Sequence, residues 1–497
     1  MNHSPIATQS DKPIFLAMGV IGLLYALATA AGWTAVPTAD HHAGNGHAAG
    51  VIPHYIATMP FVLLLGAIAT FPLIPKISVW WDSNTHRLWI AVGLAGLTLL
   101  YYLFFYPAAG IAKVQSVLDH AILQEYVPFI VLLFSLYSIA GGIRIQGDLP
   151  AHSGTNAMFL GIGSILASFI GTTGAAMLLI RPLLETNAER KYVRHTIVFF
   201  IFMVCNTGGC LLPIGDPPLF LGYLEGVPFL WTLWGLWMPW LFVNVALLAA
   251  YYLLDAMIFY RKERAADLTR DERQIRPLQI RGLWPNAALL VGVIITVACL
   301  DPRKPIPFTA WHPWIYLREV VQIGLVGLSL WLGSREVRQA NRFTYHAIVE
   351  VAALFVGIFI CMQPALEILG NVGPQLGINT PDKFFWVTGS LSSVLDNAPT
   401  YLVFFKTAAA SQGGAGFTQL VASSTPEGLL AQSTLAGISL GAVFMGAMTY
   451  IGNGPNFMVR AIAEESGVRM PSFFGYVLYY SVPVLLPIFY LTTRLFV

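Results

Sequence analysis

The sequence predicts an all-α integral membrane protein, and three observations carry that prediction. Of 497 residues, 56% are hydrophobic and only 10% are charged, whereas an ordinary soluble protein has roughly 25% charged residues. Long apolar stretches recur along the chain, each close to the roughly 20 residues that a helix needs to cross a bilayer. A few of these stretches are interrupted near their middle by polar and Gly-rich segments.

Apolar stretches long enough for a full crossing number about eleven. They cover 13–33, 55–75, 88–107, 127–147, 194–222, 237–260, 283–301, 315–333, 347–370, 431–459 and 473–496. Two further apolar stretches, 155–184 and 385–406, contain the polar interruptions FIGTTGAAM and SSVLDNAP. We interpret both as re-entrant helix-break-helix hairpins, because unwound backbone is tolerated at membrane depth only where protein or water satisfies its polar groups.

The distribution of positive charge tests this layout, because Lys and Arg accumulate in short cytoplasmic loops. With a cytoplasmic N-terminus and two re-entrant hairpins, 20 of the 27 Lys and Arg residues fall on the inside. If either hairpin crossed the membrane, every later loop would be inverted and the bias would disappear. The first hairpin therefore opens from the cytoplasm, the second opens from outside, and the C-terminus lies outside. We expect a multi-pass protein of the bacterial inner membrane.

The N-terminal region leaves two alternatives open. Stretch 13–33 is interpreted as a transmembrane helix, but its LATAAG sequence offers small residues for signal cleavage. The HHAGNGH motif in 34–53 is interpreted as a flexible polar loop, with metal binding as the alternative. The four cysteines fall within predicted spans and indicate no disulfide framework.

The chain divides into two similar halves of opposite orientation. Residues 1–50 hold the extra first helix and an outer loop, and 51–260 form a first repeat of five crossings and a hairpin. Residues 261–281 form a basic cytoplasmic linker, and 282–497 form the second repeat. An odd number of crossings per repeat makes the second copy upside down relative to the first. Inverted repeats are typical of secondary transporters, whose sites lie near the midplane where broken helices meet.

Polar breaks occur at corresponding places in both halves. The crossing after the first hairpin contains NTGGCLLPIGDPP at 206–218, and the crossing after the second contains TYIGNGPN at 449–456. Both include Ile-Gly followed by Asp216 or Asn453. Pro and Gly at a break free backbone carbonyl oxygens, and Asp, Asn, Ser and Thr supply further oxygens. Such oxygen-rich surroundings suit a hard cation, by the logic that gives divalent ions oxygen ligands.

Asp396 and Asp216 are the two acidic residues within these breaks, one in each half. A charged side chain at membrane depth costs about 2.5–3.5 kcal/mol on insertion scales, so each carboxylate is a candidate functional group. The competing interpretation is that either carboxylate only caps the N-terminus of a broken half-helix. For Asp216, the Asp-Pro-Pro sequence also fits a turn near the membrane surface. We expect Asp396 to be the coupling carboxylate, with Asp216 assisting it.

Three segments of the sequence resemble the NhaD-type sodium/proton antiporters. They are GTTGAAMLLIRPLL, NTGGCLLPIGDPPLFLGYLEGVPFLWT and SSVLDNAPTYLVFF. Those antiporters belong to the ion transporter superfamily, together with arsenite, citrate and dicarboxylate carriers. The resemblance implies a homodimer with a scaffold domain and a transport domain, the latter containing both hairpins and the broken crossings. Neither hairpin tip has the Ser-Asn-Thr sequence typical of dicarboxylate carriers, which argues against a carboxylate substrate.

The resemblance also implies the residues of a cation site. Carried over by motif, the site draws on Thr172, Thr173, Asn206, Thr207, Asp216, Ser393, Asp396, Asn397, Thr400, Asn453 and Asn456. The ions are transported substrates, Na⁺ or Li⁺ and H⁺, and no resident cofactor is implied. Expected partners are small inorganic ions, the lipid bilayer and a second copy of the chain, with no nucleic acid.

The sequence favours exchange of Na⁺ or Li⁺ for H⁺ by alternating access. Burial raises the pKa of a carboxyl group and a bound cation lowers it, so competition for one carboxylate couples the two fluxes. The alternative is a Na⁺- or H⁺-coupled carrier of citrate, a dicarboxylate or arsenite, with the anion bound at half-helix N-termini. Two Asp and no Lys or Arg in the breaks favour the cation. An enzyme is disfavoured by the lack of a nucleotide loop or nucleophile motif, and a channel would not need paired inverted breaks.

Overall fold

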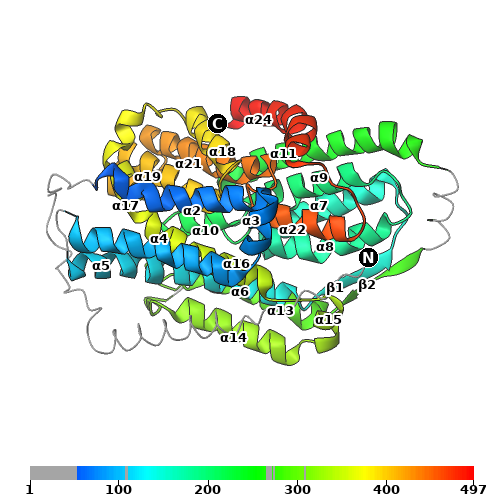
Figure 1. Cartoon of the computed structure of the whole chain (residues 1–497), viewed down its shortest axis with the longest axis horizontal. Helices are drawn as coiled ribbons and strands as arrows, with labels where there is room; N and C mark the ends of the chain where they lie inside the picture. The colour runs from blue at the N-terminus through cyan, green and yellow to red at the C-terminus, as the bar shows by residue number, and fades with distance from the viewer. Residues whose placement is uncertain (1–52, 107–109, 265–270, 272–274, 307–308) are drawn as a thin grey trace. The chain divides into compact units, whose positions relative to one another are not determined.

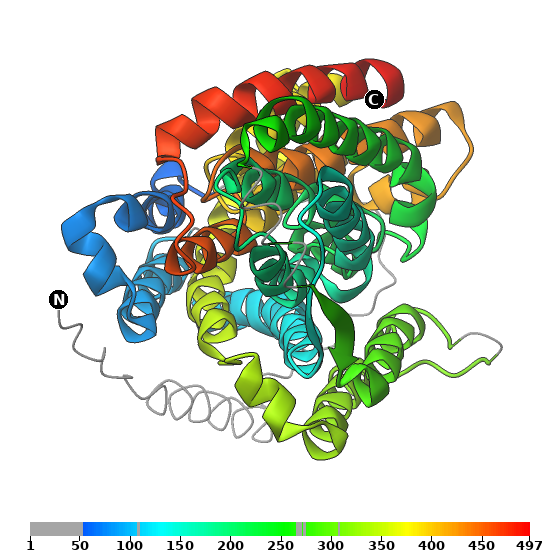
Figure 2. The same cartoon turned by 90° about the vertical axis from the view of Figure 1, so that its right-hand side faces the viewer.

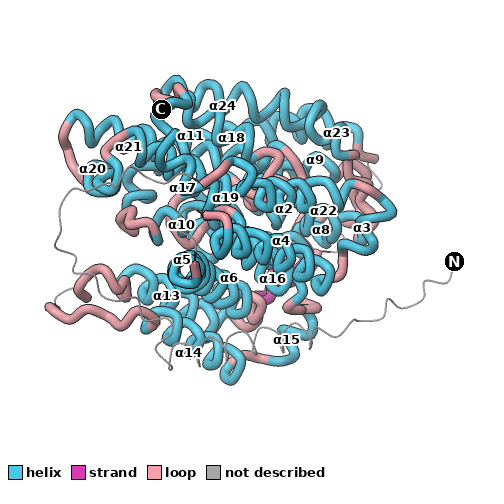
Figure 3. The backbone as a smooth tube through the Cα atoms, turned by 60° about the vertical axis from the view of Figure 1, so that its left-hand side comes forward, coloured by secondary structure: helices cyan, strands magenta, loops and turns pink. Residues whose placement is uncertain are grey.

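The computed structural model of the chain describes residues 53–106, 110–264, 271, 275–306 and 309–497. Most of this part of the chain is helical, as the tube in Figure 3 shows. The mostly helical, apolar character expected for a membrane protein is therefore confirmed. The predicted helix at 13–33 and the HHAGNGH motif lie outside the described residues, and both stay predictions.

The chain forms two compact units, of which the first comprises Met1–Val127 and Thr344–Asn371. Within this unit, α4 and α16 pack at close range, since a Cβ atom on Gly357 would come within 2.7 Å of the Ala91 side chain. Small residues at such crossing points let membrane helices approach one another. The helices described in this unit are α2 (Met59–Thr70), α3 (Pro75–Trp81), α4 (Asn84–Phe104), α5 (Ile111–Leu118), α16 (His346–Cys361) and α17 (Gln363–Val372).

The second unit comprises Pro128–Phe343 and Val372–Val497 and holds both predicted hairpins and both predicted breaks. Its elements in the first half of the chain are α6 (Val127–Ala140), β1 (Arg144–Asp148), α7 (Ser153–Ile170), α8 (Thr172–Thr186), α9 (Arg194–Met203), α10 (Pro217–Leu224) and α11 (Trp231–Leu254). Those that follow are β2 (Arg276–Arg281), α13 (Leu283–Cys299), α14 (Leu317–Leu332), α15 (Arg335–Ala340), α18 (Pro381–Ser392), α19 (Asn397–Ser411), α20 (Phe417–Val421), α21 (Pro426–Met445), α22 (Gly454–Glu465), α23 (Phe473–Tyr476) and α24 (Val482–Phe496).

Six described helices are long and apolar enough to cross a membrane, and a seventh is obtained if α16 and the bent segment after it count as one. The six are Asn84–Phe104, Ile111–Ala140, Ser153–Ile170, Trp231–Lys262, Pro426–Met448 and Phe473–Phe496. This number is smaller than the predicted eleven because the predicted span 13–33 lies outside the described residues and several other predicted spans are short or interrupted. The apolar stretch 55–75, for example, changes from α-helix to a 3₁₀ turn at Phe71, and 194–222 is broken between α9 and α10.

The helix predicted at 127–147 begins earlier and ends earlier than expected. It runs from Ile111 through a π-helical segment, Asp119–Tyr126, to Ala140. The polar residues in Asp119–Tyr126 lower the local hydropathy. Because the prediction was based on apolar runs, it placed the start of the helix after this segment. The chain beyond Ala140 turns into β1 instead of continuing the helix.

A two-stranded antiparallel ladder departs from the all-α prediction (Figure 2). Strand β1 pairs with β2, which is the last part of the 261–281 linker, in a register that places Arg144 opposite Arg281. A register shift next to Gly147 accompanies a backbone φ of +145°, and Leu278 Cα would lie 2.8 Å from a Cβ atom there. Only glycine fits this position without strain. The linker is thus tied to the segment that precedes α7.

A buried ion-pair cluster joins the loop before α9 to the end of α11. Arg190 Nη2 lies 2.6 Å from Asp255 Oδ1, and His195 Nε2 lies 2.8 Å from the same oxygen. Glu263 accepts hydrogen bonds from the backbone N–H groups of Lys191 and Tyr192. The cluster fixes the start of α9, the helix that leads to the first break.

We expect Asp255→Asn to lower the free energy of unfolding by about 2 kcal/mol, because hydrogen bonds to charged groups contribute about 1.5–3 kcal/mol. The measurement is thermal unfolding in detergent with a thiol-reactive dye, which suits this chain because Cys205, Cys210 and Cys361 are buried. Arg261→Gln changes an exposed charge near the end of the same helix and should leave the transition unchanged. An unshifted transition in Asp255→Asn would contradict a stabilising role for the cluster.

Candidate functional site

The first hairpin turns at a single glycine. Helix α7 ends at Ile170, Gly171 adopts a φ of +80°, and α8 begins at Thr172. A positive φ of this size is readily adopted only by glycine, so Gly171 ends one helix and lets the next begin directly. The backbone N–H of Thr172 donates to Gly215 O at 2.9 Å, which attaches the hairpin tip to the first break.

The first break separates α9 from α10. After α9 ends at Met203, Asn206 leaves the helical conformation (φ −139°, ψ −85°), and a short 3₁₀ turn follows. Glycines in this segment are poor helix formers. Pro217 then starts α10, since proline has no N–H to leave unpaired at a first helical position.

The second half of the site is built in a similar way. Helix α18 ends at Ser392, and α19 begins at Asn397 with Asp396 as its N-cap. The Asp396 carboxylate accepts a hydrogen bond from Ala398 N at 3.0 Å, which is the geometry of an N-cap. Beyond α21, a second break ends at Asn453, the residue immediately before α22.

The two breaks share a close approach of backbone to backbone. A Cβ atom on Gly215 would meet Gly209 O and would lie 2.9 Å from Ser168 Cα. A Cβ atom on Gly452 would meet Gly446 O and would lie 2.9 Å from Ser392 O. The residues after these glycines, Asp216 and Asn453, also have similar extended dihedral angles, −143°/141° and −153°/140°.

Asp216 is the centre of the site, where three other segments converge on its carboxylate. Asn397 Nδ2 of α19 donates to Oδ2 at 2.7 Å, and Thr172 Oγ1 of α8 donates to Oδ1 at 3.1 Å. Asn453 Nδ2 donates to Oδ1 at 3.2 Å. Both hairpin tips and both breaks therefore meet at one side chain that is only 1% exposed.

The donors around Asp216 are all neutral. Among the described residues, no Lys, Arg or His forms an ion pair with this carboxylate. Two neighbouring amide oxygens, Asn397 Oδ1 and Asn206 Oδ1, are buried and have no hydrogen-bond partner in the described part of the chain. A buried charge without an opposite charge is costly, and unpaired buried acceptors add to that cost. A cation at this place would relieve both costs, and a proton on Asp216 would remove the buried charge.

Asn206 and Asn456 connect the two breaks directly. Asn206 Nδ2 donates to Asn456 Oδ1 at 2.8 Å, and both side chains are fully buried. Asn456 Nδ2 in turn donates to the carbonyl oxygens of Gly446 and Thr449, at 2.9 and 3.0 Å. This network fixes the orientation of Asn206, whose free oxygen is a candidate ligand.

The remaining predicted site residues are near the breaks but make no hydrogen bond to Asp216. Thr207 Oγ1 donates to Asn244 Oδ1 at 3.0 Å, and Thr400 Oγ1 donates to Asp396 O at 2.9 Å. Ser393 Oγ donates to Ser390 O within its own helix end. Thr173 lies in the first turn of α8 and is half-buried. Asp396 is also half-buried, and its coupling role stays a prediction.

Four further residues hold the breaks in place. Ser392 and Thr449 begin two of the motifs quoted above but were not assigned to the site, and Ser168 and Asn244 were not singled out. Ser168 Oγ donates to Gly208 O at 2.5 Å, and Ser392 Oγ donates to Ala442 O at 2.6 Å. Thr449 Oγ1 accepts from two backbone N–H groups of the second break. Asn244, on α11, bonds Thr207. A serine a few residues before each hairpin tip was the available signal for the two serines.

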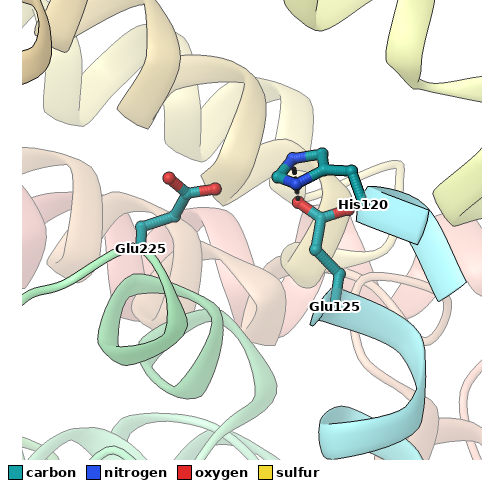
Figure 4. Close-up of side chains that lie close together, drawn as sticks. All are labelled: His120, Glu125 and Glu225. Atoms are coloured by element: carbon teal, nitrogen blue, oxygen red, sulfur yellow. Dashed lines mark ion pairs between the residues drawn. The ribbon is translucent and has the colours of Figure 1, made fainter. Parts of the chain in front are cut away.

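A second group of titratable side chains lies in the first unit. His120 Nε2 is 3.5 Å from Glu125 Oε1 (Figure 4), and Glu125 also accepts a hydrogen bond from Gln363. Glu225, labelled in the same figure, belongs to the second unit and pairs with Lys406. Each of the two carboxylates therefore already has a partner within its own unit.

The half-helix N-termini are poorly suited to an anion. Pro217 and Pro218 remove the first two N–H groups of α10, and Pro455 removes one from α22. The α19 terminus is occupied by the Asp396 carboxylate. Anion binding at a helix start depends on free N–H groups and a favourable dipole, and these termini offer few such groups.

Comparison with known proteins identifies the family. A family model described as "Putative citrate transport" matches residues 51–497. No curated protein matches the chain. The match covers the two units apart from the N-terminal segment, including every residue of the Asp216 site. The chain therefore belongs to this family of membrane transporters.

Proposed function

We propose that the protein is a secondary active transporter that exchanges Na⁺ or Li⁺ for H⁺, with Asp216 as the group for which the two ions compete. The observation that carries the proposal is the buried Asp216 carboxylate, which is held by three neutral donors and has no ion pair among the described residues. A bound cation or proton supplies the missing positive charge. The free oxygens of Asn206 and Asn397 add neutral ligands of the type that a hard cation prefers.

Competition at Asp216 explains how the two fluxes would be coupled. A carboxyl group that holds a proton attracts a cation less, and a bound cation disfavours protonation. The Asp216 carboxylate is neutralised in both states, so either can be carried through a low-dielectric region at a lower cost than the bare carboxylate. Asp396 supplies a second negative charge next in the chain to Asn397, and we propose an assisting role for it, which reverses the roles that the sequence led us to expect for the two carboxylates.

The proposal includes eleven crossings, two re-entrant hairpins and two inverted repeats. Helix α10 packs against α19, and α22 packs against α8, so each broken crossing contacts the hairpin of the other half (Figure 1). These reciprocal contacts between the two halves support a pseudo-symmetric transport domain. At 18 residues α7 is as long as a span, so its re-entry rests on the charge distribution. We also propose a homodimer in the bacterial inner membrane, with the N-terminus cytoplasmic and the C-terminus outside.

A second candidate is a Na⁺- or H⁺-coupled carrier of citrate or a related anion. The family description favours it. The helix N-termini of the site argue against it, because proline residues and the Asp396 carboxylate take the positions that an anion would need. In this candidate Asp216 would still bind the coupling cation.

Flux measurements separate the two candidates. The purified protein is reconstituted into liposomes that contain a pH-sensitive dye. A proton gradient is imposed across the membrane, and NaCl, LiCl, KCl or sodium citrate is then added in turn. Antiport predicts a pH change with Na⁺ or Li⁺ chloride, unaltered when citrate replaces chloride. A response that requires citrate would establish the anion carrier instead.

We expect Asp396→Asn to slow Na⁺-driven exchange by about tenfold and to leave stability unchanged. Asparagine and aspartate are comparable N-caps, so α19 keeps its start. The substitution removes a negative charge near the site. If this raises the activation free energy of exchange by about 1.36 kcal/mol, the rate falls tenfold. The rate in proteoliposomes is the measurement. Complete loss of exchange would make Asp396, instead of Asp216, the primary coupling group.

A further inference from the structure

A cavity of about 760 Å³ lies in the second unit, away from Asp216. The end of α8, the loop before α9, the first turn of α9 and the segment after α22 form its walls. It lies on the side that the charge distribution predicts to be cytoplasmic. Its basic lining residues are Arg181, Arg190, Lys191, Arg194 and Arg469.

The positive charge of this cavity is largely uncompensated. Arg190 is committed to Asp255, but the other four basic side chains form no ion pair with any carboxylate in the described residues. Glu185 is the single carboxylate among the described lining residues. Arg194 Nε donates to Arg469 O. This hydrogen bond joins the start of α9 to the segment after α22, two of the walls of the cavity. Three of the four side chains, Lys191, Arg194 and Arg469, are exposed to solvent at the cavity, and four charges of one sign around one volume attract an anion there.

The rest of the lining suits an anion attached to an organic group. Leu184, Val193, Phe259 and Tyr480 contribute apolar and aromatic surface beside the basic side chains. Basic pockets between transmembrane helices on the cytoplasmic side are a known setting for anionic headgroups. Arginine also recognises phosphate oxygens through paired N–H donors. A phosphate monoester, or a lipid with two phosphodiesters such as cardiolipin, carries about two negative charges and compensates more of the four charges than a single carboxylate does.

We propose that this cavity binds a phosphate group, carried either by an anionic lipid or by a soluble phosphate compound, as a site separate from the transport site. Its position gives binding a route to the transport machinery. Helix α8 starts at Thr172 and α9 leads to Asn206, and both helices also contribute to the cavity wall. A ligand there holds together the helices that position the Asp216 site.

The test measures binding of two probes to the purified full-length protein. Native mass spectrometry measures the binding of cardiolipin, and phosphatidylcholine is the comparator without net charge. Calorimetry measures the binding of inorganic pyrophosphate, and citrate is the comparator without phosphate. Each Lys or Arg near a charged surface contributes about 1 kcal/mol, so Lys191→Gln with Arg469→Gln should weaken binding roughly thirtyfold. Arg261→Gln with Arg335→Gln removes the same charge from exposed positions outside the cavity and should not weaken it.

Each outcome decides the proposal. Saturable cardiolipin binding that the cavity variant loses supports a lipid site, and the same result with pyrophosphate supports a soluble ligand. The charge-conserving variant Lys191→Arg with Arg469→Lys should bind like the wild type, which controls for misfolding. The proposal is overturned if the wild type binds neither probe, if both double variants lose binding equally, or if citrate binds as tightly as pyrophosphate.

Discussion

Asp216→Asn is expected to reduce Na⁺-driven proton exchange in proteoliposomes at least about 100-fold. Two unit charges about 4 Å apart interact by about 4 kcal/mol at an effective dielectric constant of 20, and 1.36 kcal/mol corresponds to tenfold in rate. The substituted amide also cannot exchange a proton in the working pH range. Its N–H₂ group would face the donor of either Asn397 or Asn453, so it cannot replace the carboxylate as an acceptor on both sides.

A matched control separates loss of this site from loss of any carboxylate. Asp382→Asn makes the same change near the start of α18, where the carboxylate accepts a hydrogen bond from Thr380. This variant should retain most of the exchange rate. Normal exchange by Asp216→Asn, at equal amounts of folded protein, would contradict the assignment.

Gly215→Ala is expected to lower the free energy of unfolding by about 3 kcal/mol or more and to abolish exchange. The new methyl group would meet Gly209 O and approach Ser168 Cα to 2.9 Å. Both obstacles are backbone atoms, which cannot rotate away as a side chain can, and overpacking of this kind costs about 1–3 kcal/mol or more. Movement of Gly215 would also displace Asp216 and release Thr172 N from Gly215 O.

Gly454→Ala is the control for this effect. It places the same methyl group at the start of α22, beside the second break, where no atom other than those of its chain neighbours and its own helix backbone lies within 4 Å of the added carbon. Thermal unfolding with the thiol-reactive dye should show a lower transition for Gly215→Ala and an unchanged one for Gly454→Ala. Equal transitions in both variants would mean that the break is less tightly packed than the structure indicates.

Local sequence features predicted the breaks well because their cause is local. Glycine at 171 and proline at 217 interrupt helices for reasons of backbone geometry and hydrogen bonding alone. The positions at which helices end and restart in these four segments therefore agree with the sequence analysis within a few residues. The same reasoning identified Asp216, Asn397 and Asn453 as polar residues at these places.

The enclosure of Asp216, and not of Asp396, by hydrogen-bond donors could not be predicted in this way. Which of them is enclosed depends on segments far apart in the chain, since Asp216 receives donors from residues at 172, 397 and 453. Asp396 finds its partner two residues away and acts as a local cap. Asn244 escaped notice for the same reason, because it lies in an apolar helix and bonds Thr207 only in the folded chain.

The most direct test of the account is proton release on sodium binding. Purified protein in weakly buffered detergent solution receives NaCl, with choline chloride as the control for ionic strength, while the pH is recorded. If Na⁺ and H⁺ compete for Asp216, NaCl releases up to about one proton per chain, choline chloride releases none, and Asp216→Asn responds to neither. Sodium binding without proton release, or release by Asp216→Asn equal to that of the wild type, would contradict the account.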